Sequence, residues 1–195
     1  MTKSIGLHER KKRAAMRRIQ ECALDLFDER GYESVTVEQI AQAAEVSPSS
    51  IYRYFGTKER VVLYDELDIE FLTRVDAELV DHPPVEAVRR ALAVVMATFF
   101  DRESDLARRK TRYALSEPAL QSAMTELTEG FVEQVKTALA RAAGRPTDEL
   151  EIEVVATALV WALVAATRHW HAGGYRASLA EEMEASLAIL ERGLR

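Results

Sequence analysis

The chain has 195 residues, of which 48% are hydrophobic and 30% are charged, and its formal net charge is −6 at pH 7. This length is enough to bury a hydrophobic core without disulfide or metal staples, and the single cysteine, Cys22, excludes an intramolecular disulfide. With only 8 glycines and 5 prolines, and with apolar residues at three- and four-residue spacing, the sequence indicates an all-α fold and argues against a many-stranded sheet.

No segment predicts export or membrane insertion. The basic N-terminus is followed by no apolar core of a signal peptide. The most apolar stretch, residues 154–167, is shorter than a bilayer span and is followed by Arg168 and His169. We therefore expect a cytoplasmic protein.

The positive charge is concentrated at one end. Residues 1–20 hold seven lysines or arginines and one acid, Glu9, and residues 1–60 carry a net charge of +2, which leaves −8 for residues 61–195. A basic end on an acidic body suits a chain that places only this end against phosphate groups. A solvated helix start, or a tail without structure, would give the same charge pattern.

The first predicted helix covers residues 10–30. Ile19, Ala23, Leu26 and Phe27 form one apolar stripe, and Gly31 is a natural stop after the last turn. Cys22 lies beside this stripe, so we interpret it as a small core residue rather than a redox group or ligand.

Two short helices follow. Thr36 with Gln39 forms a capping box that predicts a helix over residues 37–44. Ser47 caps the next helix, residues 48–55, with Pro48 at its first position. Gly56 ends that helix, and Thr57 caps another that begins at Lys58.

Such short helices cannot each bury a core, but packed on a longer helix they form the tri-helical unit that presents its last helix to a DNA groove. Helical phase places Ile51 and Phe55 in the core and turns Ser49, Tyr52 and Arg53 outward. A surface of hydroxyls that serves solubility alone is the other interpretation of this face.

The motifs over residues 10–60 are specific. The sequence reads ALDLF at 23–27, GY at 31–32, TVEQIA at 36–41, AEVS at 44–47 and IYRYF at 51–55, followed by Lys58 and Glu59. This pattern resembles the N-terminal domain of TetR-family bacterial transcriptional repressors. One departure is Glu45, which stands where the family often has glycine and therefore implies mild strain or a different turn.

The resemblance implies a DNA-binding surface. The implied phosphate contacts are Thr36, Ser50, Tyr54 and Lys58. The residues where the family contacts bases or the adjacent backbone are Ser47, Pro48, Ser49, Tyr52 and Arg53. The arm formed by residues 10–13 would reach a neighbouring minor groove. Because direct base readout by this face is sparse, we expect DNA shape to contribute to specificity.

The remaining sequence predicts further helices, about nine in all. They cover residues 58–80, 84–100, 105–115, 118–143 and 148–171, and a last helix is capped by Ser178 and Glu181. We expect a DNA-binding domain at residues 1–57 and an effector-binding and dimerisation domain at residues 58–195.

The helix at residues 148–171 is apolar almost all round. Val155, Leu159, Ala162, Leu163 and Ala166 form a stripe that Val154, Trp161 and Val164 widen. Such a helix needs neighbours on two sides, which fits the family's homodimer through the last two helices. A central core helix of a monomer is the alternative. A two-fold dimer would read a palindromic operator in double-stranded DNA.

The helices between residues 84 and 171 would enclose a pocket for a small-molecule effector. The expected lining residues are Met96, Phe99, Phe100, Arg112, Tyr113, Phe131, Trp161 and Arg168, of which the two arginines would anchor an anion. The C-terminal half is loosely similar to the branch of the family that includes the mycofactocin-locus regulator, which implies a lipophilic or acyl-thioester effector.

The resemblance implies a repressor released from its operator when the effector tilts the helix that starts at Lys58. A transcriptional activator and a non-specific, architectural DNA-binding protein remain alternatives. We expect no enzyme activity, metal or cofactor, because no nucleophile elbow or phosphate loop is present. His169 and His171 do not share one helical face, so they do not form a zinc pair.

Overall fold

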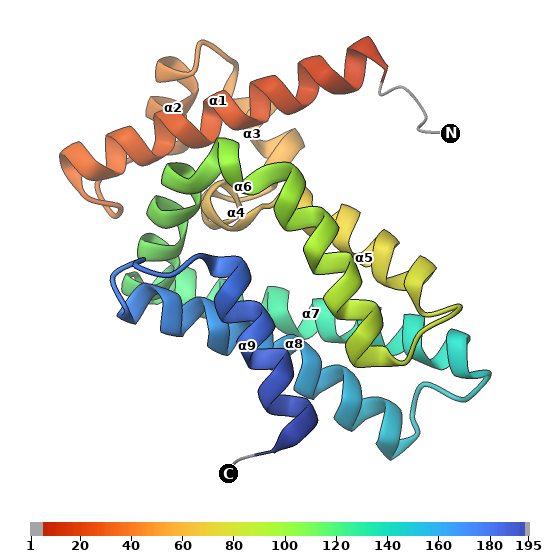
Figure 1. Cartoon of the computed structure of the whole chain (residues 1–195). Helices are drawn as coiled ribbons and strands as arrows, with labels where there is room; N and C mark the ends of the chain where they lie inside the picture. The colour runs from red at the N-terminus through yellow and green to blue at the C-terminus, as the bar shows by residue number, and fades with distance from the viewer. Residues whose placement is uncertain (1–5, 194–195) are drawn as a thin grey trace. The chain divides into compact units, whose positions relative to one another are not determined.

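The computed structural model describes residues 6–193, and it describes the side chains of these residues except 7–9, 66 and 98–104. Residues 6–193 form nine α-helices and no β-strand, so the predicted all-α class is confirmed (Figure 1). The helices are α1 (Leu7–Arg30), α2 (Val37–Ala43), α3 (Pro48–Phe55), α4 (Lys58–Leu63), α5 (Glu66–Glu78), α6 (Pro84–Ser116), α7 (Pro118–Ala143), α8 (Leu150–Ala172) and α9 (Leu179–Arg192).

The chain divides into two compact units. The first contains residues 1–64 and 116–123, and the second contains residues 65–115 and 124–195. The expected boundary after residue 57 would separate α4 from α1 and α3, with which α4 packs inside the first unit. The chain therefore crosses between the units at three points, after residues 64, 115 and 123.

Local caps define the short helices of the first unit. Thr36 Oγ1 accepts a hydrogen bond from the Gln39 amide (3.3 Å), and Gln39 Oε1 accepts one from the Thr36 amide (2.9 Å), so the predicted capping box is confirmed. Ser47 caps α3 with Pro48 in its first turn, and Thr57 caps α4. These side chains satisfy amides that a helix start leaves unpaired.

The expected single helix over residues 58–80 is wrong, because the structure breaks it into α4 and α5. Tyr64 adopts an extended backbone conformation (ψ 128°), and Asp65 caps α5 by accepting a hydrogen bond from the Leu67 amide (3.0 Å). An aspartate that caps the following helix favours a new helix start over continuation.

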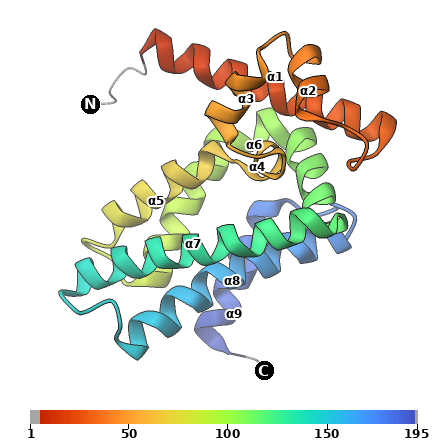
Figure 2. The same cartoon turned by 180° about the vertical axis from the view of Figure 1, so that it is seen from behind.

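The two helices expected at residues 84–100 and 105–115 are instead one helix, α6, of 33 residues. The stretch between the two expected helices, residues 101–104, contains neither glycine nor proline to end a helix. By residue count α6 is the longest helix among the described residues, and its path can be followed in Figures 1 and 2.

The core of the second unit is formed by side chains from α5 to α9. Val75 of α5, Ala87 of α6, Ala156 of α8 and Leu187 of α9 are fully buried in it. Helix α9 packs on α8 and is capped by Ser178, and the predicted capping box with Glu181 is confirmed.

Helix α8 corrects one expectation from the sequence. By length and mean hydropathy α8 is long and apolar enough to cross a membrane, whereas we expected no stretch of that length. Its buried residues are those of a core helix, among them Ile152, Leu159 and Trp170. Burial in the folded chain thus accounts for only part of the apolar character of α8, because 28% of its most apolar stretch is buried.

Candidate nucleic-acid interface and effector region

Helix α3 is built on a small core that α1, α2 and α4 share. Ile19 of α1, Ile40 of α2, Ile51 of α3 and Val61 of α4 are each at most 1% exposed. Because these four side chains fix one face of every helix, the opposite face of α3 is held in a defined direction.

The exposed face of α3 is polar and aromatic, as helical phase predicts. Ile51 and Phe55 are buried, whereas Tyr52 is 50% exposed and its neighbour Arg53 is also exposed. Ser47, Pro48 and Ser49 are exposed at the start of the helix. The structure thus brings the residues expected to contact bases onto one end and one side of α3.

Hydroxyl groups cluster at the first turn of α3. Ser47 Oγ lies 2.8 Å from Ser49 Oγ and 2.9 Å from Ser50 Oγ, and it also accepts a hydrogen bond from the Ser50 amide (3.2 Å). Hydroxyls next to a helix N-terminus can donate to phosphate oxygens or to base edges.

Arg53 lies across the half-buried Tyr54. Its guanidinium carbon is 4.9 Å from the centre of the Tyr54 ring, and Nη2 is 3.4 Å from both Ser50 Oγ and Tyr54 Oη. Stacking on an aromatic ring orients the guanidinium without neutralising its charge, so it stays available to an anion or to a base acceptor.

Lys58 is less available than the sequence suggested. Its ammonium nitrogen donates to the Tyr32 carbonyl at 2.5 Å and lies 4.0 Å from the centre of the Tyr32 ring. Partial burial lowers the pKa of Lys58 from its usual value. To contact a phosphate, this side chain has to extend away from Tyr32.

Residues 10–13 belong to α1, which begins at Leu7, three residues before the expected start. The expected arm is therefore helical at these positions. Arg10 and Lys11 are exposed, and Lys12 and Arg13 are half-buried. Thr36 is exposed at the N-terminus of α2, where its hydroxyl can still donate a hydrogen bond.

Two residues of α1 that sequence reasoning did not assign organise this surface. Arg18 Nη2 donates to the Ala44 carbonyl in the turn before α3, and buried Gln20 donates through Nε2 to the carbonyls of Val61 (2.9 Å) and Tyr64 (2.8 Å). Only the apolar spacing of Ile19 and Ala23 gave a signal here, because it places Gln20 next to a buried position.

The expected effector residues show mixed burial within the second unit. Tyr113 is buried, Met96 and Trp161 are half-buried, and half-buried Phe131 stacks on Phe71 with ring centres 6.0 Å apart. The side chains of Phe99 and Phe100 lie outside the described residues.

Both arginines expected to anchor an anion lie on aromatic rings. The Arg112 guanidinium is 5.0 Å from the centre of the Tyr113 ring, and the Arg168 guanidinium is 5.7 Å from that of Trp161. Both arginines are exposed. Their charges therefore lie at the protein surface, over aromatic rings, rather than inside the core.

The two histidines make separate contacts. His169 Nδ1 lies 2.8 Å from a carboxylate oxygen of Glu182, and His171 Nδ1 lies 2.6 Å from the Tyr175 hydroxyl. Tyr175 in turn donates to the Arg108 carbonyl (3.2 Å) and packs edge-on against Trp170. These contacts hold the loop between α8 and α9.

A buried core shared by α1, α2, α3 and α4, a three-residue turn between α2 and α3, and an outward polar face of α3 define a helix-turn-helix DNA-binding module. Residues 19–64 match the model of the tetR family of bacterial regulatory proteins, and residues 82–195 match that of the MftR C-terminal domain. The chain belongs to the TetR family of transcriptional regulators, and its residues 82–195 are of the MftR C-terminal type.

Curated relatives are similar to the chain over different lengths. It is 37% identical over 100 residues to the transcriptional regulator TcmR of Streptomyces glaucescens, a match that covers 50% of this chain and 44% of TcmR. It is 25% identical to the putative mycofactocin biosynthesis transcriptional regulator MftR of Mycobacterium tuberculosis over 90% of this chain and 89% of MftR. The chain thus spans less than half of TcmR but most of MftR.

Among solved structures, FadR of Thermus thermophilus, a TetR-family transcriptional repressor in complex with lauroyl-CoA, is 28% identical with a TM-score of 0.51. That match covers 92% of this chain and 95% of FadR. A putative TetR-family regulator of Syntrophomonas wolfei matches with a TM-score of 0.62 at 18% identity, which shows the shared fold.

Proposed function

We propose that this TetR-family regulator is a homodimeric, sequence-specific repressor that leaves its operator when a lipophilic effector binds the second unit. The observation that carries the DNA-binding part is the division of α3 into a buried side, Ile51 and Phe55, and an exposed side, Ser49, Tyr52 and Arg53. A helix with this division can enter the major groove without exposing its core.

The chemistry of this surface suits a division between phosphate and base contacts. The proposed phosphate contacts are Thr36, Ser50, Tyr54 and Lys58, and the proposed base or adjacent backbone contacts are Ser47, Pro48, Ser49, Tyr52 and Arg53. Phosphate contacts fix the register and make binding sensitive to salt, whereas base contacts select the sequence. Arg53 is the one cation among the proposed base contacts, which favours a contribution from DNA shape.

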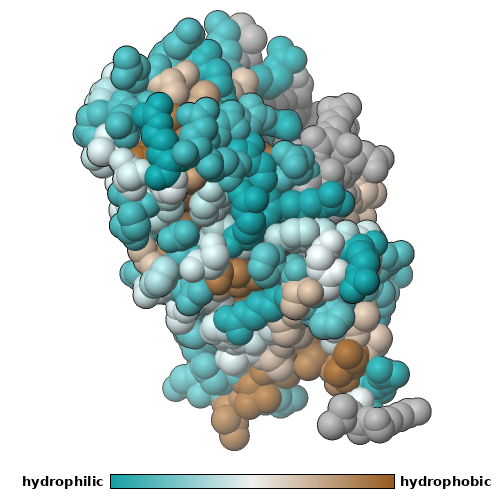
Figure 3. Space-filling model, turned by 90° about the vertical axis from the view of Figure 1, so that its left-hand side faces the viewer, coloured by the Kyte–Doolittle hydropathy of each residue, from teal (hydrophilic) through white to brown (hydrophobic). Residues whose placement is uncertain are grey.

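Exposed apolar residues on the last two helices support the dimer. Leu150 and Val154 of α8 are 76% and 55% exposed, and Ile189 and Leu190 of α9 are 47% and 38% exposed. Figure 3 shows hydrophobic side chains gathered at the lower end of the molecule, where α8 and α9 lie in Figure 1. Burying such a surface against a second copy removes apolar area from water.

Two observations support a lipophilic effector. The expected lining residues Met96, Phe131 and Trp161 are apolar and only half-buried, so they are not sealed inside the core. FadR of Thermus thermophilus, which is similar over most of both chains, is a repressor that binds lauroyl-CoA. We infer an acyl thioester as the effector class.

An effector bound to the second unit can influence the first unit through the points where the chain passes from one unit to the other. Because α4 and α5 are separate helices, the expected tilt of one continuous helix is replaced by a bend at Tyr64 and Asp65. The crossings after residues 115 and 123 offer a second path, through the end of α6 and the start of α7. The effector shifts DNA affinity by its preference for one of two conformations.

The test begins with selection of duplexes from a random-sequence library by the wild-type protein. Lauroyl-CoA is then added to the complex with the selected duplex, with free CoA as the control, and calorimetry measures its binding to the protein. We expect DNA affinity to fall with lauroyl-CoA and to persist with CoA. Calorimetric saturation by lauroyl-CoA without loss of DNA affinity would contradict release by this effector class.

A further inference from the structure

The turn between α2 and α3 contains a strained residue. Ala44 is the C-cap of α2, and Glu45, which follows it, has a φ of +53°, in the left-handed region that favours glycine. The Val46 amide donates to the Ala41 carbonyl (2.9 Å), which closes the helix end. Only three residues separate the last residue of α2 from Ser47, the N-cap of α3. The direction of α3 therefore depends on this turn.

Arg18 of α1 contacts this turn at two points. Its Nη2 donates to the Ala44 carbonyl, and its Nη1 lies 3.8 Å from Glu45 Oε2. A guanidinium at the C-terminus of α2 also lies where the helix dipole favours positive charge. These contacts connect α1 to the turn that sets the direction of α3.

The contact between Arg18 and Glu45 does not serve to fill the core, because both side chains remain largely exposed. Their side chains are 50% and 84% exposed, so neither is needed to fill the core. An ion pair this exposed contributes little to stability by itself. Its effect is on the geometry of the turn. Arg18 holds the Ala44 carbonyl in place next to Glu45, whose positive φ is unfavourable for a residue with a side chain.

We propose that Arg18 is a positioning residue for DNA recognition, which sets sequence specificity by holding the α2–α3 turn rather than by contacting phosphate. This inference rests on the proposed DNA-binding function. Removing the contact lets the turn relax and α3 change its aim, which weakens base contacts while the phosphate contacts persist. The consequence is a loss of discrimination between sequences, with the salt dependence of binding preserved.

The experiment measures the affinities of the dimeric full chain for a duplex that the wild type has selected and for a scrambled duplex, at several salt concentrations. Arg18→Met is expected to lower the ratio of the two affinities roughly tenfold, the effect of one hydrogen bond from a charged group. The slope of log affinity against log salt should equal that of the wild type. Arg30→Met removes the same charge from the far end of α1 and serves as the matched control.

A phosphate contact gives a different result. If Arg18→Met weakens both duplexes equally and reduces the salt slope by about one, Arg18 contacts phosphate and the inference is wrong. A ratio equal to that of the wild type also overturns it. If the wild type itself selects no sequence, the proposed function fails, and the inference fails with it.

Two further variants separate positioning from folding. Arg18→Lys keeps the positive charge but lacks the two guanidinium nitrogens that contact Ala44 and Glu45. Its ratio of affinities for the selected and scrambled duplexes should therefore lie between that of Arg18→Met and that of the wild type. Glu45→Gly in the Arg18→Met background removes the strain at φ +53°, so the turn should hold without Arg18 and the ratio should recover. A double variant that stays as unselective as Arg18→Met would overturn the proposal, and circular dichroism confirms which variants are folded.

Discussion

The side-chain amide of Gln20 donates a hydrogen bond of 2.8 Å to the carbonyl of Tyr64, and thereby ties the middle of α1 to the point where α4 ends. The same amide donates to the Val61 carbonyl at 2.9 Å, and Gln20 is 8% exposed. One polar side chain thus donates to two carbonyls at the end of a helix, where backbone carbonyls run out of partners within the helix.

Replacing Gln20 should destabilise the first unit. Gln20→Leu removes the hydrogen bonds that Gln20 donates to the carbonyls of Val61 and Tyr64, so we expect a loss of about 1–3 kcal/mol in the free energy of unfolding. Chemical denaturation measures this change. Gln42→Leu, at an exposed position of α2, is the control and should stay within about 0.5 kcal/mol of the wild type. Equal stability of the two variants would show that the Gln20 contacts do not hold the end of α4.

Tyr52 gives the sharpest test of the α3 surface. Because it is 50% exposed, Tyr52→Ala should preserve folding and the dimer but reduce affinity for the selected duplex by roughly tenfold or more. Tyr52→Phe removes only the hydroxyl and separates hydrogen bonding from packing. Fluorescence anisotropy measures the affinities. Wild-type affinity in Tyr52→Ala would place the DNA surface elsewhere.

The surface of α8 and α9 can be tested by charge. Val154→Glu should convert the dimer to a monomer, because it places a carboxylate in an apolar interface. Val80→Glu is the matched control, since Val80 is 78% exposed in the turn after α5 and is not expected in the interface. Analytical ultracentrifugation distinguishes the two. A dimer that persists in Val154→Glu would exclude this part of α8 from the interface.

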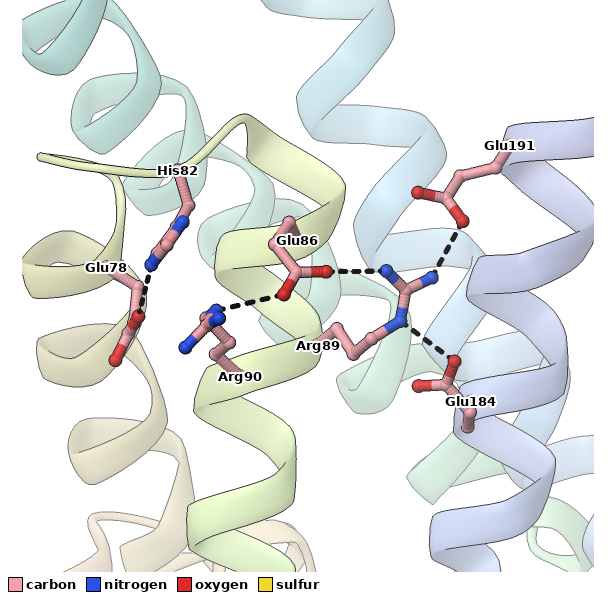
Figure 4. Close-up of polar contacts among 7 residues, drawn as sticks. All are labelled: Glu78, His82, Glu86, Arg89, Arg90, Glu184 and Glu191. Carbon is pink, nitrogen blue, oxygen red and sulfur yellow. Dashed lines mark hydrogen bonds and ion pairs between the residues drawn. The ribbon is translucent and has the colours of Figure 1, made fainter.

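Arg89 links α6 to α9 through two carboxylates. It lies 2.8 Å from Glu184 and 2.7 Å from Glu191, and it also pairs with Glu86 of its own helix at 2.8 Å (Figure 4). These hydrogen bonds raise the pKa of Arg89, so it stays protonated.

We predict that Arg89→Met destabilises the folded chain by roughly 0.5–1 kcal/mol and so lowers its thermal midpoint. The decrease in the midpoint should be smaller in high salt, which screens the ion pairs. Arg90→Met is the control, because Arg90 pairs with Glu86 within α6. Calorimetry at low and high salt measures both. An Arg89→Met effect no larger than that of Arg90→Met would show that the bridge to α9 does not stabilise the unit.

The raised pKa of Asp68 predicts that the stability of the folded chain depends on pH. Burial, followed by the nearby Asp65 carboxylate, raises the pKa of Asp68 from 3.8 to about 7 in the folded chain. The folded state therefore binds more protons than the unfolded state between these values, and stability contributed by the protonated carboxyl is lost as pH rises through about 7. Asp68 keeps an exposed surface, so water reduces the size of the effect.

Asp68→Asn should flatten this dependence, because the amide does not titrate. The pH dependence of stability is measured by unfolding midpoints at several pH values between about 4 and 8, a range that spans the unfolded and folded pKa values of Asp68. If the wild type and Asp68→Asn lose stability equally over this range, the protonated carboxyl of Asp68 does not contribute.

Much of the DNA-binding module could be predicted because its signals are local. The caps at Thr36 and Ser47 and the buried spacing of Ile51 and Phe55 depend on residues within four positions of each other. The positive φ of Glu45 likewise follows from its place in the turn.

The rest depends on contacts between distant residues. Arg18 is hydrogen-bonded to Ala44, 26 residues further along the chain, and Gln20 to Val61, 41 residues further along. Neither contact produces a periodic pattern in the sequence. The break at Tyr64 was missed because apolar spacing continues through it, while the cap by Asp65 is a single weak signal.

We propose above all that α3 reads the DNA sequence. The most direct measurement is the ratio of wild-type affinities for the selected and the scrambled duplex at physiological salt. We predict a ratio of roughly 1,000 or more, as specific protein–DNA complexes show. A ratio near one would make the chain a non-specific DNA-binding protein and contradict the account.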